Sequence, residues 1–295
     1  MFGCKSLSSL LFLAMVAACA PRSLTLLDFA ADGGLASDSL DDSPADLFAY
    51  DVGLAPDSID GNSVDASDAG TPADLLHGLI GLWHLDDDIG SKVASDSSGH
   101  GNDGNLVNLD PSQAWVPGRQ GGGLATNGAG YVLVPDSASI NGITAQVTVS
   151  AWVYLDGVIS ATDLYGTAIS RQIGSTDEQY YHLSLFQGGF PSLFIGMSAK
   201  ILPVHVVASQ AVISRHWTHL AGTYDGSRAV LYVDGVEVGS QSISGVFPAD
   251  TAALVLGGNG NKATTTELFP GSLDEIALYD RALSPEEIRL LANPQ

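Results

Sequence analysis

The chain has 295 residues, with 33 acidic and 11 basic side chains and a formal net charge of −22. Hydrophobic residues make up 45% of the chain, which is enough for a sizeable core and excludes a wholly disordered protein. Because phosphate binding requires clustered Lys and Arg, the acid excess argues against a nucleic-acid partner and against electrostatic docking on anionic lipid. The only cysteines are Cys4 and Cys19, so the remainder of the chain forms no internal disulfide.

The first residues have the composition of an export signal. Lys5 supplies a positive charge, and an apolar run from Leu7 to Ala18 follows it. The run is about a dozen residues long, shorter than the ~20 residues that a membrane-spanning helix needs. A charged start followed by a short apolar run and small residues is typical of a secretion signal. We therefore predict a signal peptide at residues 1–18.

The end of this segment contains a lipid-attachment motif. Residues 16–19, Val-Ala-Ala-Cys, resemble a bacterial lipobox, which implies cleavage before Cys19 and acyl chains on Cys19. The alternative is an ordinary signal peptide with an incidental cysteine. The resemblance predicts a lipoprotein of the cell envelope that is attached to the membrane by its lipid anchor alone. Ala20, in place of the aspartate that signals inner-membrane retention in enteric bacteria, favours the outer membrane.

An acidic segment follows the predicted anchor. Residues 23–77 contain twelve Asp and no Glu, Lys or Arg, and their apolar residues show no sustained period of 2 or 3.6. Like charges repel, and so few apolar residues cannot offset the entropy of ordering the segment. We predict that residues 19–77 are the lipidated Cys and a disordered tether. Calcium binding by the tether is not favoured, because the Asp-x-Asp-x-Asp-Gly spacing with a closing Glu is absent.

From residue 78 onward, short alternating apolar runs separated by turn residues predict an all-β domain at 78–295. The predicted strands are 80–85, 131–134, 147–154, 181–186, 193–195, 217–224, 229–233, 236–238, 254–256 and 273–279. Asp225-Gly226 and Asp234-Gly235 lie between such runs and predict hairpins. Ser284-Pro285-Glu286-Glu287 predicts a capped helix start. The fold class is therefore an antiparallel two-sheet β-sandwich or jelly roll with a short C-terminal helix.

Seven motifs in order resemble a known family. They are Gly81–Asp86, Asp96–Gly104, Tyr131–Asp136, Val149–Val153, Trp217–Gly226, Leu231–Gly235 and Gly271–Ser284. Together they are similar to a LamG-like jelly roll of the concanavalin A-like lectin/glucanase superfamily, over about residues 78 to 292. The resemblance implies a two-sheet sandwich, frequent calcium binding, and recognition of carbohydrate or of cell surfaces.

A structural calcium ion is the cofactor that we predict. The polar, Gly-rich loop 96–104 can turn several oxygens inward, but calcium needs six to eight, so another carboxylate must contribute. The resemblance suggests Asp96 and Asp274 as ligands, with Asn102 and Asp86 as further candidates because they adjoin the same motifs. The alternative is that these residues only form turns. A bound ion would tie the loop to the last strand.

Catalysis is not predicted. The related glucanases carry Glu-x-Asp-x-Glu on one strand face, whereas alternation here places Glu275, Ala277 and Tyr279 on one face. Asp274 and Asp280 would share the other face with Ile276 and Leu278, too far apart to cooperate. The favoured function is a non-catalytic, surface-anchored module that binds a glycan or another cell-surface polymer. The alternative is an adhesive display domain with a protein partner; a glycoside hydrolase is disfavoured.

Aromatic residues are candidates for sugar stacking. Trp115 in a Pro- and Gly-rich stretch can contact a sugar or anchor its loop, and Tyr165, Tyr180 and Tyr181 near the region 156–180 are alternatives. Four residues inside strand motifs are predicted to be packed in the core: Trp83, Trp152, Trp217 and His219.

Overall fold

The computed structural model describes residues 74–159, 164–173, 178–197, 203–248, 250–261 and 264–294. The predicted signal peptide, Cys19 and residues 20–73 of the predicted tether lie outside this part. Contacts divide the chain into Met1–Asn62 and Ser63–Gln295, and all described residues belong to the second unit. Within the described ranges, no helix is long and apolar enough to cross a membrane.

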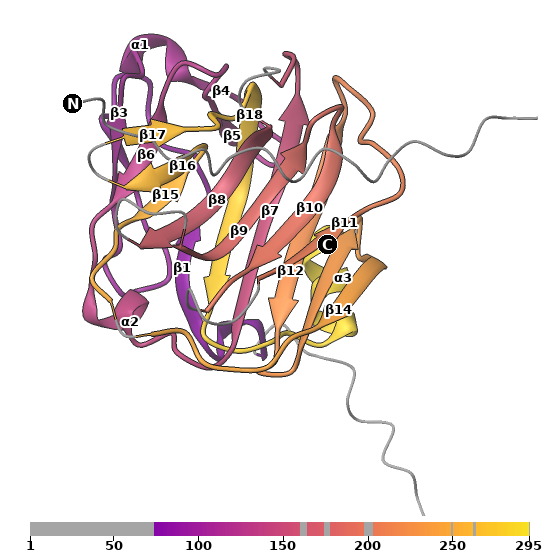
Figure 1. Ribbon diagram of the computed structural model, residues 1–295. Helices are drawn as coiled ribbons and strands as arrows, with labels where there is room; N and C mark the ends of the chain where they lie inside the picture. Colours follow the sequence, from indigo (N-terminus) through magenta and orange to yellow (C-terminus); the bar gives the residue numbers. More distant parts are fainter. Residues whose placement is uncertain are drawn as a thin grey trace, which may run out of the picture. The chain divides into compact units, whose positions relative to one another are not determined.

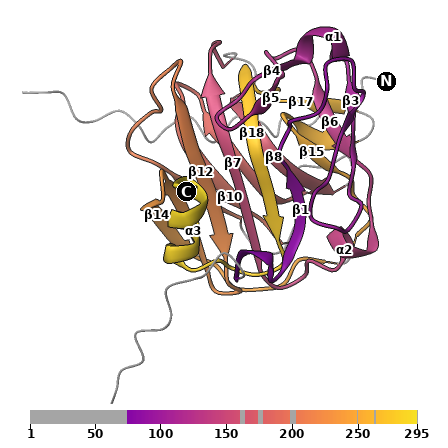
Figure 2. The same ribbon diagram turned by 180° about the vertical axis from the view of Figure 1, so that it is seen from behind.

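Two antiparallel eight-stranded sheets form a sandwich (Figures 1 and 2). Sheet A has the order β14-β13-β12-β7-β18-β5-β4, and β1 also pairs with β18. Its strands are β1 (Leu79–Trp83), β4 (Trp115–Pro117), β5 (Gly122–Ala125), β7 (Val147–Leu155), β12 (Trp217–Tyr224), β13 (Arg228–Val233), β14 (Val236–Ser242) and β18 (Gly271–Tyr279). The predicted fold class is confirmed.

Sheet B, nearer the viewer in Figure 1, has the order β11-β10-β9-β8-β15-β6-β3-β2. Its strands are β2 (Val93–Ala94), β3 (Gly104–Val107), β6 (Tyr131–Val134), β8 (Tyr165–Ile173), β9 (Glu178–Phe186), β10 (Phe190–Ile195), β11 (Val204–Val207) and β15 (Leu254–Leu256). A small hairpin, β16 (Asn259–Asn261) and β17 (Thr264–Thr266), completes the strands. The helical elements are η1 (Asp74–Leu76), α1 (Pro111–Ala114), α2 (Ala138–Asn141) and α3 (Pro285–Ala292).

The hydrophobic core lies between the sheets, and strand alternation explains its composition. On β7, Val149, Ala151 and Val153 face inward and are fully buried. Trp152, between them, therefore points to the outer face of sheet A, where it is buried against His219. Trp152 is thus buried as predicted, although outside the inter-sheet core. The prediction of Trp217 as a core residue is wrong, because Trp217 lies on the same outer face and is only half-buried against Tyr154.

A bulge in β18 changes the predicted alternation. Its register against β7 shifts between Asp274 and Ala277, and Glu275 has a positive φ of 47°. As a result, Leu273 and Ile276 both enter the inter-sheet core. Asp274 instead shares the outer side with Ala277, so its predicted placement beside Ile276 and Leu278 is wrong.

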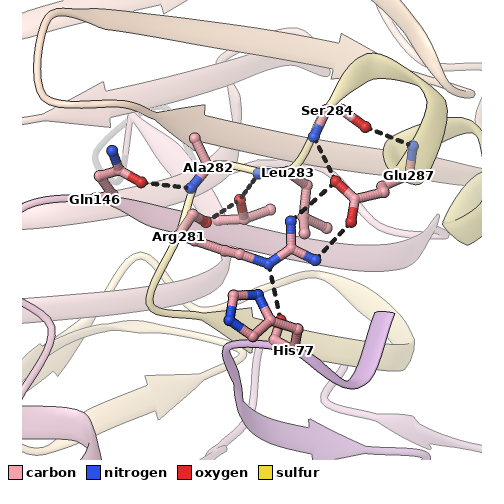
Figure 3. Close-up of polar contacts among 8 residues, drawn as sticks. His77, Gln146, Arg281, Ala282, Leu283, Ser284 and Glu287 are labelled. Atoms are coloured by element: carbon pink, nitrogen blue, oxygen red, sulfur yellow. Dashed lines mark hydrogen bonds and ion pairs between the residues drawn. The ribbon is translucent and has the colours of Figure 1, made fainter. Parts of the chain in front are cut away.

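The C-terminal helix α3 closes the outer face of sheet A through Ile288, and its predicted capping box is present. Figure 3 shows the network at its start: Glu287 accepts from the Ser284 N–H at 2.8 Å and from the Arg281 guanidinium at 2.5 and 2.9 Å. Arg281 Nε also donates to the His77 carbonyl at 2.8 Å. The two ends of the described domain are thereby joined, and residues 74–77, predicted to belong to the tether, take part in the fold.

Candidate functional site

The predicted calcium loop is organised around Asp96. Its Oδ1 accepts the N–H groups of Leu82 and Ser98 at 3.0 and 2.9 Å, and Oδ2 accepts the Asn102 N–H and the Ser98 hydroxyl at 2.8 Å. Burial alone would raise the pKa of Asp96, but these hydrogen bonds lower it. The Asn102 side chain donates to the Ile80 carbonyl at 2.7 Å. Asp96 and Asn102 together fasten the loop to β1.

Asp274 and Asp86 organise a different segment, the turn between β4 and β5. Asp274 Oδ2 accepts the N–H groups of Arg119 and Gln120 at 2.7 and 2.9 Å, and Asp86 accepts the N–H of Gly122. Burial raises the pKa of Asp274 to about 6 despite these bonds.

The four predicted ligands therefore lie as two pairs, on two segments. In the described part of the chain, no group of three or more His, Cys, Asp or Glu side chains is arranged to hold a metal ion. The oxygens of Asp96 and Asp274 already accept backbone N–H groups, which is the arrangement of turn-forming carboxylates. As placed, these residues do not fit one calcium site, and calcium binding stays a prediction.

An aromatic cluster lies on the outer side of sheet B. We call its five residues, Tyr165, His182, Phe186, Phe194 and His205, the aromatic face. They come from β8, β9, β10 and β11, and cross-strand pairing brings Tyr165 beside Phe186, and Phe194 between His182 and His205. Neighbouring ring centroids are 5.0–6.4 Å apart. All except His182 are partly exposed, so the rings present an apolar surface to solvent.

A buried polar layer supports this surface. Ser184 and Ser192 lie 2.7 Å apart, oxygen to oxygen, and the Thr167 hydroxyl lies 3.2 Å from His182 Nε2. Burial lowers the pKa of His182 to about 3 and also lowers that of His205. Both imidazoles are therefore neutral at pH 7. Because strand alternation puts 182, 184 and 186 on one side, these small and large side chains share one face.

The β16–β17 hairpin borders the aromatic face with a carboxylate. The Glu267 carbonyl accepts from the Thr167 N–H at 3.0 Å, and its carboxylate accepts from Asn259 Nδ2 at 2.6 Å. Burial, and after it the charge of Glu267, raise the pKa of the Tyr165 phenol. Two buried atoms here, His205 Nε2 and Asn259 Oδ1, have no hydrogen-bond partner among the described residues.

Residues 126–289, more than half of the chain, match the family described as the concanavalin A-like lectin/glucanases superfamily. The chain belongs to this superfamily. A search of curated proteins finds no match.

Solved structures of the same lectin/glucanase fold include domain 4 of AbnA, a GH43 extracellular arabinanase from Geobacillus stearothermophilus, in complex with arabinotriose. It is 24% identical, with a TM-score of 0.55, covering 73% of this chain and 98% of that one. The binding domain of Paraclostridial Mosquitocidal Protein 1 is 18% identical, with a TM-score of 0.56, covering 74% and 52%. Trypanosoma rangeli sialidase with sialic acid is 20% identical, with a TM-score of 0.54, covering 73% and 33%. This chain thus spans about half of the second protein and a third of the third.

The predicted stacking residues of this lectin-like domain have different positions. Tyr165 belongs to the aromatic face, whereas Tyr180 and Tyr181 are fully buried. Trp115 is buried, and its Nε1 donates to the Ser91 carbonyl at 2.9 Å, so it anchors its loop. Phe186, Phe194, His205 and Glu267 were not predicted as site residues. Their alternation within strands was visible, but which face is outward depends on the whole sandwich.

A second surface feature of the lectin-like domain is a groove of about 440 Å³ beside the end of β12. Its lining mixes apolar residues with polar ones, and His216 and Asp234 are its titratable side chains. Ile213 and Val238, both in the lining, are 72% and 39% exposed. A groove of this volume falls within the size range of ligand pockets.

Proposed function

We propose that the protein is a non-catalytic, surface-anchored module that binds carbohydrate through the aromatic face. The observation that carries the proposal is the set of partly exposed rings over a buried polar layer. Binding sites combine such apolar area with a few directed polar groups, here the Tyr165 hydroxyl and Glu267. The arabinotriose complex of a structural neighbour supports this ligand class.

The proposal excludes catalysis on chemical grounds. Glycoside hydrolysis normally uses two carboxyl groups that flank the scissile bond. Among the described residues that build the aromatic face and its border, Glu267 is the carboxylate. Asp274 lies on the other sheet, where it is buried and holds a turn. The superfamily fold is compatible with a non-enzymatic role.

Anchoring and calcium complete the proposal. Acyl chains on Cys19 would hold the protein at the outer membrane, and the acidic tether would separate the domain from the lipid. A calcium ion, if bound, would be structural and would not be part of the aromatic face.

The test is isothermal titration of the full chain with neutral oligosaccharides, arabinotriose among them, chosen after a glycan array. Tyr165→Ala should weaken binding at least about tenfold, because a hot-spot ring contributes about 2 kcal/mol or more and about 1.4 kcal/mol corresponds to a factor of ten. Tyr154→Ala is the matched control, since Tyr154 is a partly exposed tyrosine on the outer face of the other sheet. Equal losses in both variants, or no binding to any sugar by the wild type, would reject the proposal.

The groove favours a second candidate, adhesion to a protein partner. Ile213→Asp places a charge on its exposed apolar rim and should abolish adhesion to a protein-coated surface, whereas Tyr165→Ala should not. If Tyr165→Ala abolishes adhesion and Ile213→Asp does not, the aromatic face is the binding site and the groove is not.

A further inference from the structure

We infer that the groove at the end of β12 binds an extended peptide that carries an apolar side chain and a basic side chain two residues apart. This inference rests on the second candidate function, adhesion to a protein partner, and specifies the segment that such a partner presents. It does not involve the aromatic face. Three features of the groove carry it: unused backbone groups in one wall, apolar side chains in the other, and a carboxylate at the hairpin turn.

One wall of the groove is the segment 208–213, which follows β11. Two of its N–H groups, those of Ala208 and Val212, donate to the carbonyls of Pro191 and Gly189 at 2.9 Å. Its other N–H groups and all of its carbonyls have no hydrogen-bond partner among the described residues, and four of its six residues are exposed. Backbone groups form strong hydrogen bonds, so a row of unused ones beside a groove favours pairing with an extended peptide.

The other wall comes from sheet A, from the hairpin of β13 and β14. A bulge opposite Leu231 and Tyr232 leaves Val238 as the extra residue of β14. Val238 lines the groove together with Val233. These two side chains offer an apolar contact to one side chain of the peptide, and its binding is favoured because apolar surface is removed from water.

Asp234, at the turn of this hairpin, supplies a carboxylate to the groove. Its Oδ1 accepts the His219 N–H at 2.9 Å, which fixes the side chain, and the residue is exposed. Two arginines of neighbouring segments are paired with other carboxylates, Arg215 with Asp156 and Arg228 with Glu237. The whole chain has a formal net charge of −22, so a basic side chain is attracted both by Asp234 and by the overall field of the protein.

Charge also distinguishes this occupant from two others. A second copy of the chain would bring two negatively charged domains together, and residues 23–77, with twelve Asp, would meet Asp234 with like charges. An extended peptide from a basic partner instead offers backbone donors and acceptors to the segment 208–213. Its side chains at positions i and i+2 point to the same side, which places an apolar and a basic side chain over the groove together.

The probe is a fluorescently labelled pentapeptide with blocked ends, Thr-Val-Thr-Lys-Thr, and its binding to the full chain is measured by fluorescence anisotropy. Replacing its Lys by Glu should weaken binding at least about fivefold, because attraction to Asp234 becomes repulsion. Alternate N–H groups of an extended chain point to opposite edges. N-methylation of Val and Lys, or else of the central Thr, should therefore weaken binding at least about tenfold in one case and much less in the other. Equal effects of the two methylation patterns would overturn the inference.

Variants of the protein place the peptide in the groove. Ala211→Trp fills the groove from an exposed position and should weaken peptide binding at least about tenfold. Ala129→Trp is the matched control at an exposed alanine between β5 and β6, and it should leave binding unchanged. Asp234→Asn keeps an acceptor for the His219 N–H but removes the charge, so it should remove most of the preference for Lys over Glu. Equal losses in the two Trp variants, or an unchanged preference in Asp234→Asn, would contradict the inference.

The outcomes separate this inference from both proposed functions. Tyr165→Ala should leave peptide binding unchanged, so failure of the aromatic face as a sugar site does not affect the groove. If the wild type binds no peptide but Ile213→Asp still abolishes adhesion to a protein-coated surface, the second candidate function stands and the extended peptide is wrong. The inference is also wrong if Ala211→Trp abolishes sugar binding instead of peptide binding. A concentration-dependent doubling of the mass in light scattering that Ala211→Trp abolishes would assign the groove to a second copy of the chain and would equally overturn it.

Discussion

Replacing Arg281 by methionine should destabilise the domain more than any exposed charge substitution. Arg281→Met keeps an unbranched side chain but removes both bonds to Glu287 and the bond to the His77 carbonyl. The side chains of Arg281 and Glu287 are only 19% and 10% exposed, so water replaces the lost partners poorly. Hydrogen bonds to charged groups contribute about 1.5–3 kcal/mol, and we expect a loss of about 2–3 kcal/mol.

A domain of this size loses roughly 2–4 °C of Tm for each kcal/mol, which gives a decrease of about 4–12 °C. Thermal unfolding of the full chain, followed by circular dichroism at pH 7, measures it. Arg289→Met is the matched control, because Arg289 and its partner Glu286 are 55% and 44% exposed and such pairs contribute less than about 1 kcal/mol. Equal decreases in Tm for the two variants would refute the reasoning.

The same pair predicts a pH dependence. The hydrogen bond from Arg281 lowers the pKa of Glu287 in the folded state, relative to its ordinary value of 4.5. Stability from this pair is therefore fully present above about pH 4.5 and is lost as pH falls through the lowered pKa. The difference in Tm between wild type and Arg281→Met should shrink over that acidic range. If the difference in Tm between wild type and Arg281→Met stays constant as pH falls to the lowered pKa of Glu287, the stabilisation does not come from the charged Arg281–Glu287 pair.

Three further predictions concern the loops and their titratable groups. If calcium binds, a chelator should lower the Tm by several degrees and added calcium should restore it. If the Tm responds to neither, the prediction of a calcium site is wrong. Asp96→Ala leaves four donors without an acceptor and should cost about 2–4 kcal/mol in chemical denaturation, whereas exposed Asp88→Ala should change stability by less than about 0.5 kcal/mol. The hydrogen bond to Glu275 raises the pKa of His84 above 6.5. The pair therefore stabilises the fold below pH 6.5 and is lost as pH rises through the raised pKa, so the Tm difference between wild type and His84→Gln should be larger at pH 5.5 than at pH 8.5.

Much of the architecture was readable from local chemistry. The hairpin turns at Asp225-Gly226 and Asp234-Gly235 need residues that tolerate positive φ, and Gly226, Asp234 and Gly235 have φ values of 97°, 48° and 78°. The capping box at Ser284 is equally local. Strand β8 was missed because its sequence, YGTAISRQI, alternates weakly and includes a bulge near Thr167. Its burial comes from neighbouring strands that are distant in sequence.

The candidate site was less predictable for a related reason. Alternation divides a strand into two sides but does not say which side faces the partner sheet, so Trp217 was assigned to the core and Phe194 was not considered as a site residue. The aromatic face requires the register of four strands, β8 to β11, and no single segment contains it. The bulge at Glu275 likewise depends on pairing with β7, and it moved Asp274 to the outer side.

The bonds between Arg281, His77 and Glu287 also have a mechanical consequence. A pull on the chain ahead of residue 74 reaches η1 and His77 before it reaches β1, whose partner β18 lies inside sheet A. Because Arg281 bridges His77 to the start of α3, the load is shared between the first and last elements of the domain. A ligand bound on sheet B would pull on the opposite layer of the sandwich. The force would then act across the packed core and would not separate an edge strand from its sheet. Substituting Arg281 should therefore lower the force at which the domain unfolds.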